Sequence, residues 1–165
     1  MNSYLSKYFG EIELNKVKQW YESEIELKGK SVEIVINISI ATEIDREWII
    51  AIDDYLENLQ QHEEEIRQIM HRDLKKKSVT KEYIDILLEY HEKEDITELI
   101  KGTDKSLTKK ERILSILYVS TINFFPETAD DVFVVYDFTV DEELTDQLLV
   151  VVESKKQEIS MKIES

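Results

Sequence analysis

The segment that decides the fold is VYDFTVDEELTDQLLVVVES, residues 135–154, in which a short acidic stretch separates two strongly apolar runs. The apolar runs, within 132–140 and 148–152, are hydrophobic on both faces, which is typical of strands in the interior of a sheet. We therefore predict two central strands. Their acidic link is predicted to point outward, where its charges are solvated and protect a strand edge against aggregation.

Further strands are predicted on both sides of this pair. The segment VSTINFF, residues 119–125, is followed by Pro126 and has the period of a strand. The segment EISMKIES, residues 158–165, alternates apolar and polar side chains and predicts a half-exposed strand.

The N-terminal part of the chain predicts a β-hairpin across residues 19–39, with Gly29-Lys30 as a two-residue turn. This turn places Leu27 opposite Val32 and Ile25 opposite Ile34, so that one face is apolar. The preceding segment KYFGEIEL, residues 7–14, adds a third strand with a bend at Gly10.

The middle of the chain has helical periodicity. Thr42 and Asp45 resemble a capping pair, and apolar residues follow at helical spacing as far as Leu74. The polar stretch QQHEEE, residues 60–65, interrupts this spacing. Residues 43–76 therefore form either one long helix or two helices, and a break near 60–62 is favoured. Further helices are predicted over 80–94, with Thr80 as N-cap, in a short turn within 95–100, and from Thr108, which forms a capping box with Glu111.

Strands, then helices, then strands predict an α+β fold: a mainly antiparallel sheet built from N-terminal and C-terminal strands, with a central block of helices packed on one face. Only 3 Gly and 1 Pro occur in 165 residues, so no linker is visible and residues 1–165 are predicted to form a single domain. Trp48 lies on the apolar helical stripe and is predicted to join the core.

The net charge of -15 narrows the range of partners. It disfavours nucleic acid and anionic membranes and favours a basic protein partner. The absence of Cys excludes disulfides and thiolate metal sites. The N-terminal residues lack a signal-peptide pattern, and no run approaches the ~20 apolar residues of a membrane span, so a cytoplasmic protein is expected.

Acidic residues without any intervening Lys or Arg suggest a partner-binding surface in residues 127–146. Trp20 is predicted to be exposed at the start of the first hairpin, beside Glu22, and to serve as a second anchor for a partner. The acidic members of the predicted surface are Asp130, Asp131, Asp137, Asp141, Glu142, Glu143 and Asp146.

No motif predicts catalysis, a metal site or a cofactor. His62, His71 and His91 lie near acids, but neither H-E-x-x-H nor paired E-x-x-H spacing is present. Phosphate-binding loops rich in Gly are absent as well. The basic residues from Arg67 to Lys77 are interpreted as complementing the dipole of a helix end, or as a counter-charge to the acidic C-terminal part, and not as a nucleic-acid patch.

Three segments resemble a known family: YFGEIEL (8–14), VVYDFTVDEELTDQLLVVV (134–152) and the terminal IES (163–165). They resemble the early Y-F-G-E stretch, the late Y-D-[YF] and L-T-D-x-L-L-V-V strands and the closing E-S of a family of small bacterial proteins, domain of unknown function 2004. The resemblance implies a bacterial, single-domain, cytosolic protein. It supplies no activity and no catalytic residues.

Three hypotheses about function remain open. The first is a non-enzymatic protein-binding module, such as an immunity-type protein that recognises a basic partner through its acidic surface. The second is a metal-dependent enzyme that uses His and carboxylate residues of the helical block. The third is a homo-oligomeric structural module that pairs through the first hairpin or through an edge strand.

Overall fold

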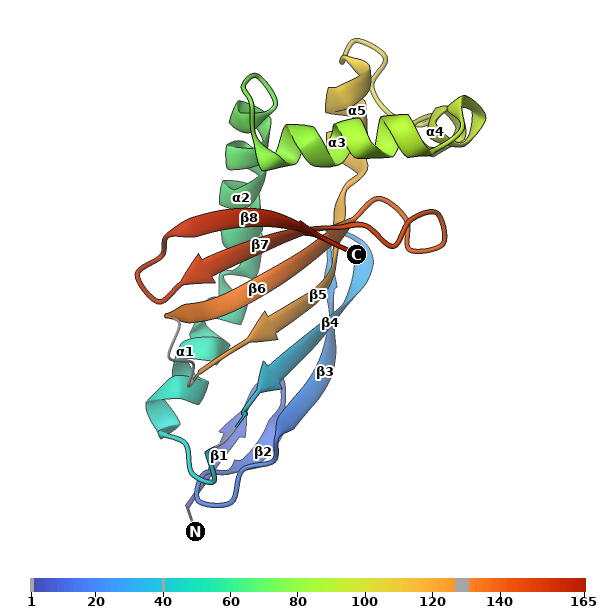
Figure 1. The fold of residues 1–165 in the computed structure, drawn as a ribbon. Helices are drawn as coiled ribbons and strands as arrows, with labels where there is room; N and C mark the ends of the chain where they lie inside the picture. The colour runs from blue at the N-terminus through green and yellow to red at the C-terminus, as the bar shows by residue number, and fades with distance from the viewer. Residues whose placement is uncertain (1, 40, 127–130) are drawn as a thin grey trace.

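The computed structural model describes residues 2–39, 41–126 and 131–165. Within these ranges the chain forms five helices and eight strands (Figure 1). In chain order they are β1 (Ser3–Ser6), β2 (Gly10–Glu13), β3 (Trp20–Leu27), β4 (Lys30–Asn37), α1 (Arg46–Glu57), α2 (Leu59–Asp73), α3 (Val79–Tyr90), α4 (Lys93–Leu99), α5 (Lys109–Ile116), β5 (Tyr118–Phe124), β6 (Val132–Thr139), β7 (Leu148–Ser154) and β8 (Ile159–Glu164).

The strands β3 to β8 form one six-stranded sheet in chain order, and β1 pairs with β2 in a separate sheet. Only β4 and β5 are parallel among the described pairs of the large sheet; the others are antiparallel. Parallel neighbours need a crossover connection, and here the whole block α1 to α5 is that crossover. The predicted α+β architecture, with central helices and terminal strands, is confirmed.

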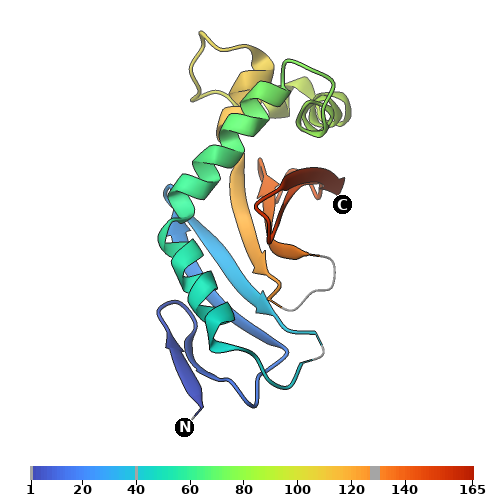
Figure 2. The same cartoon turned by 90° about the vertical axis from the view of Figure 1, so that its left-hand side faces the viewer.

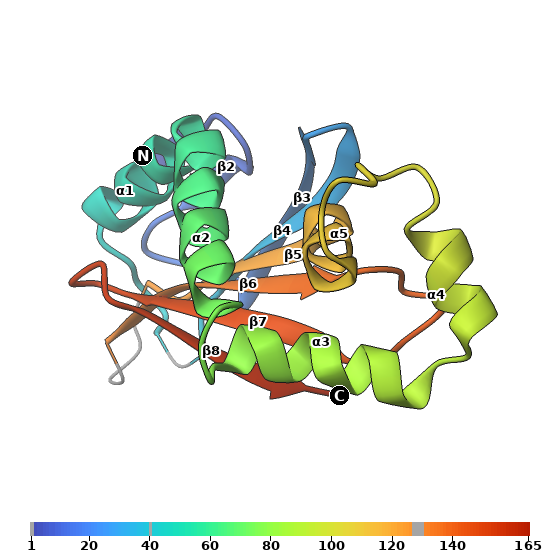
Figure 3. The same ribbon diagram turned by 90° about the horizontal axis from the view of Figure 1, so that it is seen from above.

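The helices cover one face of the sheet and one of its ends. Helices α1 and α2 follow each other along the same face (Figure 2). Helix α3 turns away from α2 and runs beside β8, where the Thr80 hydroxyl lies 3.3 Å from the sulfur of Met161 (Figure 3). None of the described helices combines the length and the apolar character needed to cross a lipid bilayer.

The two apolar runs near the C-terminus are interior strands. β6 lies between β5 and β7, and β7 lies between β6 and β8. The side chains of Val134, Tyr136 and Phe138 alternate along β6 and are fully buried in the same cluster as Leu149 and Val151 of β7. The prediction of two central strands is therefore confirmed, and β8 at the sheet edge is half-exposed as expected.

The first hairpin forms, but its turn and register differ from the prediction. The turn is Lys28-Gly29, whose φ values of 52° and 77° are both positive, as a type I′ turn requires. Ile25 therefore pairs with Val32, not with Ile34. The slip is two residues, the period of a strand, so the apolar face predicted from the sequence is preserved.

The N-terminal segment does not extend the large sheet. Gly10, with φ of 72°, starts β2, and β1 and β2 form a hairpin of their own. The buried carboxylate of Asp53 in α1 accepts hydrogen bonds from the Ser6 hydroxyl (2.6 Å), the Lys7 amide (3.1 Å) and the Tyr4 hydroxyl (3.1 Å). This network attaches the small hairpin to the helical layer. It also holds the start of the turn, residues 7–9, through the Lys7 amide.

Residues 46–73 form two helices, as favoured, but the break lies at Asn58 and not at 60–62. The Asn58 side-chain amide donates to the Asp54 carbonyl at 2.9 Å and closes the first helix. The buried stripe of α2 then continues through Leu59, Glu63 and Ile66. The polar interruption in the sequence therefore contains a buried carboxylate, since Glu63 is 1% exposed.

Of the predicted helix caps and core residues that follow, one is confirmed and two are wrong. Thr108 and Glu111 form the capping box of α5 as predicted. Ser78, not Thr80, caps α3, because its hydroxyl accepts from the Lys81 amide at 3.3 Å while Thr80 is buried. Trp48 is only half-buried and lies outside the core, with the Lys155 ammonium 4.6 Å from the centre of its ring system.

Candidate functional site

The acidic link between β6 and β7, residues 141–147, is a compact exposed turn that we call the acidic loop. The Asp141 carboxylate accepts from the amides of Glu143 (2.8 Å) and Leu144 (3.2 Å), which fixes the turn. Glu142, Glu143 and Asp146 are exposed. The loop therefore presents three carboxylates to solvent while a fourth, Asp141, holds the backbone in shape.

A groove of about 770 Å³ lies between the acidic loop and the C-terminal end of α3. The loop contributes residues 142–147, and α3 contributes Ile86 and Tyr90, followed by His91. The Tyr83 hydroxyl donates to the Gln147 carbonyl at 3.1 Å and links α3 to the end of the loop. The Tyr90 side chain is 75% exposed. Carboxylates beside an exposed aromatic ring are suited to bind a cationic side chain.

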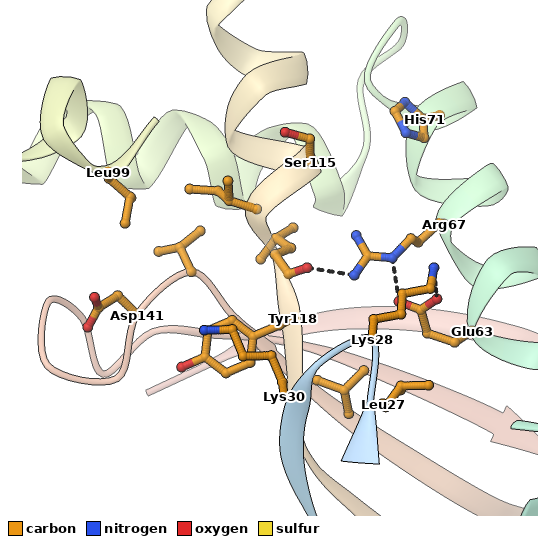
Figure 4. Close-up of a pocket in the computed structure, with 14 residues that line it drawn as sticks. Leu27, Lys28, Lys30, Glu63, Arg67, His71, Leu99, Ser115, Tyr118 and Asp141 are labelled. Carbon is orange, nitrogen blue, oxygen red and sulfur yellow. Dashed lines mark hydrogen bonds and ion pairs between the residues drawn. The ribbon is translucent and has the colours of Figure 1, made fainter. Parts of the chain in front are cut away.

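A second pocket, of about 630 Å³, lies on the other side of Asp141 (Figure 4). One side of this pocket carries the buried carboxylate of Glu63, which pairs with Arg67 Nε and, at 2.6 Å, with Lys28 Nζ. Arg67 also donates through Nη2 to the Leu117 carbonyl at 2.6 Å. These contacts join α2, the β3–β4 turn and the start of β5. Because the buried carboxylate is held by two cations from different elements, we interpret this ion network as a structural clamp.

The remaining predicted partner-binding residues do not join the groove. Asp131 lies beside β6, where its carbonyl accepts from the Lys155 amide at 2.8 Å. Trp20 is 56% exposed but pairs with Asn37, at the end of the β3–β4 hairpin opposite the Lys28-Gly29 turn. Asp130 lies outside the described residues.

Asp137 lies within β6, on the alternate side from the buried Tyr136 and Phe138. Burial raises the pKa of the Asp137 carboxyl to about 6, the nearby Glu164 carboxylate adds to this effect, and Lys162 opposes it. The Asp137 side chain projects from the interior of a strand and does not line the groove. The groove therefore depends on the acids of the loop.

The stability of the protein should depend on pH through Asp137. Its proton leaves the unfolded chain near pH ~4 but leaves the folded protein at about 6, so this group lowers stability as the pH rises through that interval. Asp137→Asn should raise the free energy of unfolding by about 1 kcal/mol at neutral pH, after allowing for solvent screening, and by almost nothing below the unfolded pKa. Urea unfolding of both proteins at the two pH values tests this; an equal difference at both would contradict it.

The three His residues lie in three different surroundings. His62 stacks on Tyr55 with ring centroids 3.9 Å apart, His71 lines the pocket that contains Glu63, and His91 lines the groove. In residues 2–39, 41–126 and 131–165, no group of three or more His, Asp and Glu side chains is arranged to hold a metal ion.

Sequence reasoning missed three parts of the molecule that carry charge or polarity. Tyr90 follows Tyr83 and Leu87 at helical spacing and so predicts burial, yet α3 ends there and the ring extends past the core. Glu63 is hidden among neighbouring Glu residues that are exposed. Glu153 follows five Leu and Val residues in β7, and this lone acid at an inward position was the available signal.

Comparisons with family models, with curated proteins and with solved structures find no match. The resemblance to domain of unknown function 2004 therefore stays a prediction.

Proposed function

We propose that this protein is a non-enzymatic protein-binding module that recognises a basic partner through the acidic loop and the adjoining groove. The observation that supports this most is the joint lining of one groove by Glu142, Glu143, Asp146 and the exposed ring of Tyr90. A Lys or Arg side chain of the partner enters the groove, where carboxylates neutralise its charge and the Tyr90 ring covers its aliphatic stem.

The net charge of the whole chain also favours a basic partner. A net charge of -15 attracts a basic partner from a distance, and the loop concentrates negative charge at the groove. Within the groove's lining, His91 is the only residue that can carry positive charge. Association is therefore expected to be fast at low ionic strength and to slow as salt is added.

An immunity-type role is the specific form of this proposal. A small acidic protein that captures a basic toxin needs a pre-formed, negatively charged surface and no catalytic residues. The acidic loop meets the first need, because Asp141 and the backbone amides hold it in place. The resemblance to a bacterial family agrees with such a role but does not identify a toxin.

A photo-crosslinking amino acid at position 90 tests the proposal. The matched control carries the same group at Leu5, which is 76% exposed in β1 and outside the groove's lining. We expect position 90, and not position 5, to capture a basic protein from the native host. That protein, once identified and purified, should bind less tightly as salt increases. Capture of only acidic or neutral proteins, identical capture at both positions, or crosslinks to a second copy of this chain would contradict the proposal.

A further inference from the structure

A pocket of about 460 Å³ lies between α1, α2 and the β7–β8 turn, and it is unrelated to the groove. Its walls are largely aromatic, with Trp48, Tyr55, His62 and Phe133 among the lining residues. The rings of Tyr55 and His62 are stacked in parallel, and Phe133 packs edge-on against Tyr55 at a centroid distance of 5.4 Å. This volume and lining are typical of a small-molecule site.

One carboxylate of the pocket, that of Glu153, is buried without a charged partner. Its side chain is 6% exposed, and its Oε2 accepts from the Tyr55 hydroxyl at 2.5 Å. The Tyr136 hydroxyl lies 2.6 Å from that of Tyr55 and extends the network into the core. Burial raises the pKa of both tyrosines well above its ordinary value, so both hydroxyls keep their protons and provide no counter-charge.

The contrast with Glu63 shows what Glu153 lacks. Glu63, also buried, forms ion pairs with Lys28 and Arg67. Within the part of the chain that the structure describes, no Lys, Arg or His nitrogen lies within ion-pair distance of Glu153. Burying a carboxylate is costly unless a positive charge compensates it. Here the carboxylate lines a pocket, so the missing charge can come from a ligand.

We propose that this pocket binds a small organic cation that carries a flat apolar body, such as an aromatic amine or amidine. The cationic group pairs with Glu153 and the flat body lies between the aromatic walls. The pocket already shows cation–π geometry, since the Lys155 ammonium lies 4.6 Å from the centre of the Trp48 rings. Lys155 holds the outer wall, and the ligand occupies the inner part next to Glu153.

Calorimetric titration with benzamidine, which combines a phenyl ring with an amidinium, tests the pocket. We expect benzamidine to bind at least about tenfold more tightly than benzamide, its neutral analogue, and benzoate not to bind, because only the amidinium compensates the buried charge. Glu153→Gln should abolish the preference for benzamidine over benzamide. Glu158→Gln, which removes an exposed acid of the adjoining turn, should leave it unchanged.

Two further variants locate the ligand. Trp48→Leu should weaken benzamidine by about fivefold, and Lys155→Ala should tighten it by about threefold, because the ammonium no longer occupies the Trp48 ring face. Trp48→Leu keeps the experiment decisive if Glu153→Gln does not fold. No binding of benzamidine, equal binding of benzamide, or unchanged binding in Trp48→Leu would overturn the proposal. Benzamidine bound only through Glu142, Glu143 and Asp146 would place it in the groove and would also overturn it.

Discussion

Replacing Glu142, Glu143 and Asp146 together by Lys is expected to weaken binding of the basic partner by about 100-fold at low salt, mostly through a slower association rate. The three side chains are exposed and line the groove. None of them forms an ion pair with a described residue. Their replacement removes attraction and breaks one weak, exposed contact, the hydrogen bond that the Gln147 side-chain amide donates to Asp146 at 3.4 Å.

The matched control reverses Glu22, Glu24 and Glu26, the three exposed acids of β3. It changes the net charge by the same amount at a different surface. We expect only a small loss of affinity from this variant, because exposed charges farther than a Debye length of about 8–10 Å from the contact are screened. Surface plasmon resonance at two salt concentrations measures both rates. Equal losses in the two triple variants would show that net charge alone attracts the partner.

Removing the carboxylate of Glu63 is expected to destabilise the fold more than any exposed change. Glu63→Ala leaves Arg67 and Lys28 without their shared partner. Loss of one partner of a buried ion pair typically costs 3–5 kcal/mol, and we expect about 2–3 kcal/mol because both cations are partly exposed. Urea unfolding measures the change.

Two comparisons make this expectation specific. Glu57→Ala breaks the exposed pair between Lys7 and Glu57 and should change the free energy of unfolding by less than about 0.5 kcal/mol. The double variant Glu63→Met with Arg67→Met replaces the main pair by apolar side chains and should recover most of the lost stability. If Glu63→Ala is no more harmful than Glu57→Ala, the network is not a clamp.

Apolar patterning predicted the sheet because burial in this chain follows it closely. Strands β6 and β7 are apolar at successive positions, and the structure gives each of them a neighbour on both sides. The predicted register of the hairpin was wrong because the prediction placed Gly at the first position of the turn. In the structure Lys28 takes that position with a positive φ, and Gly29 is second. A slip of two residues leaves the pattern unchanged, so the sequence carried no signal against it.

The candidate site was only partly predictable, since charge is visible in a sequence but its surroundings are not. The exposed acids of the loop were identified. Asp137 was grouped with them, although it is half-buried within β6 and does not line the groove. The exposure of Tyr90 depends on where α3 ends, and the burial of Glu63 depends on how α2 lies against the sheet. Such positions are set by tertiary packing, which overrides local propensity.

The central claim is that the acidic loop and the end of α3 form the docking surface for a basic protein. The most direct measurement is hydrogen–deuterium exchange of this protein alone and in complex with the purified partner. We expect slower exchange on binding in residues 86–91 and 141–147, with β3 and the β1–β2 hairpin unchanged. Protection confined to β3, or no protection in either of the two expected segments, would contradict the account.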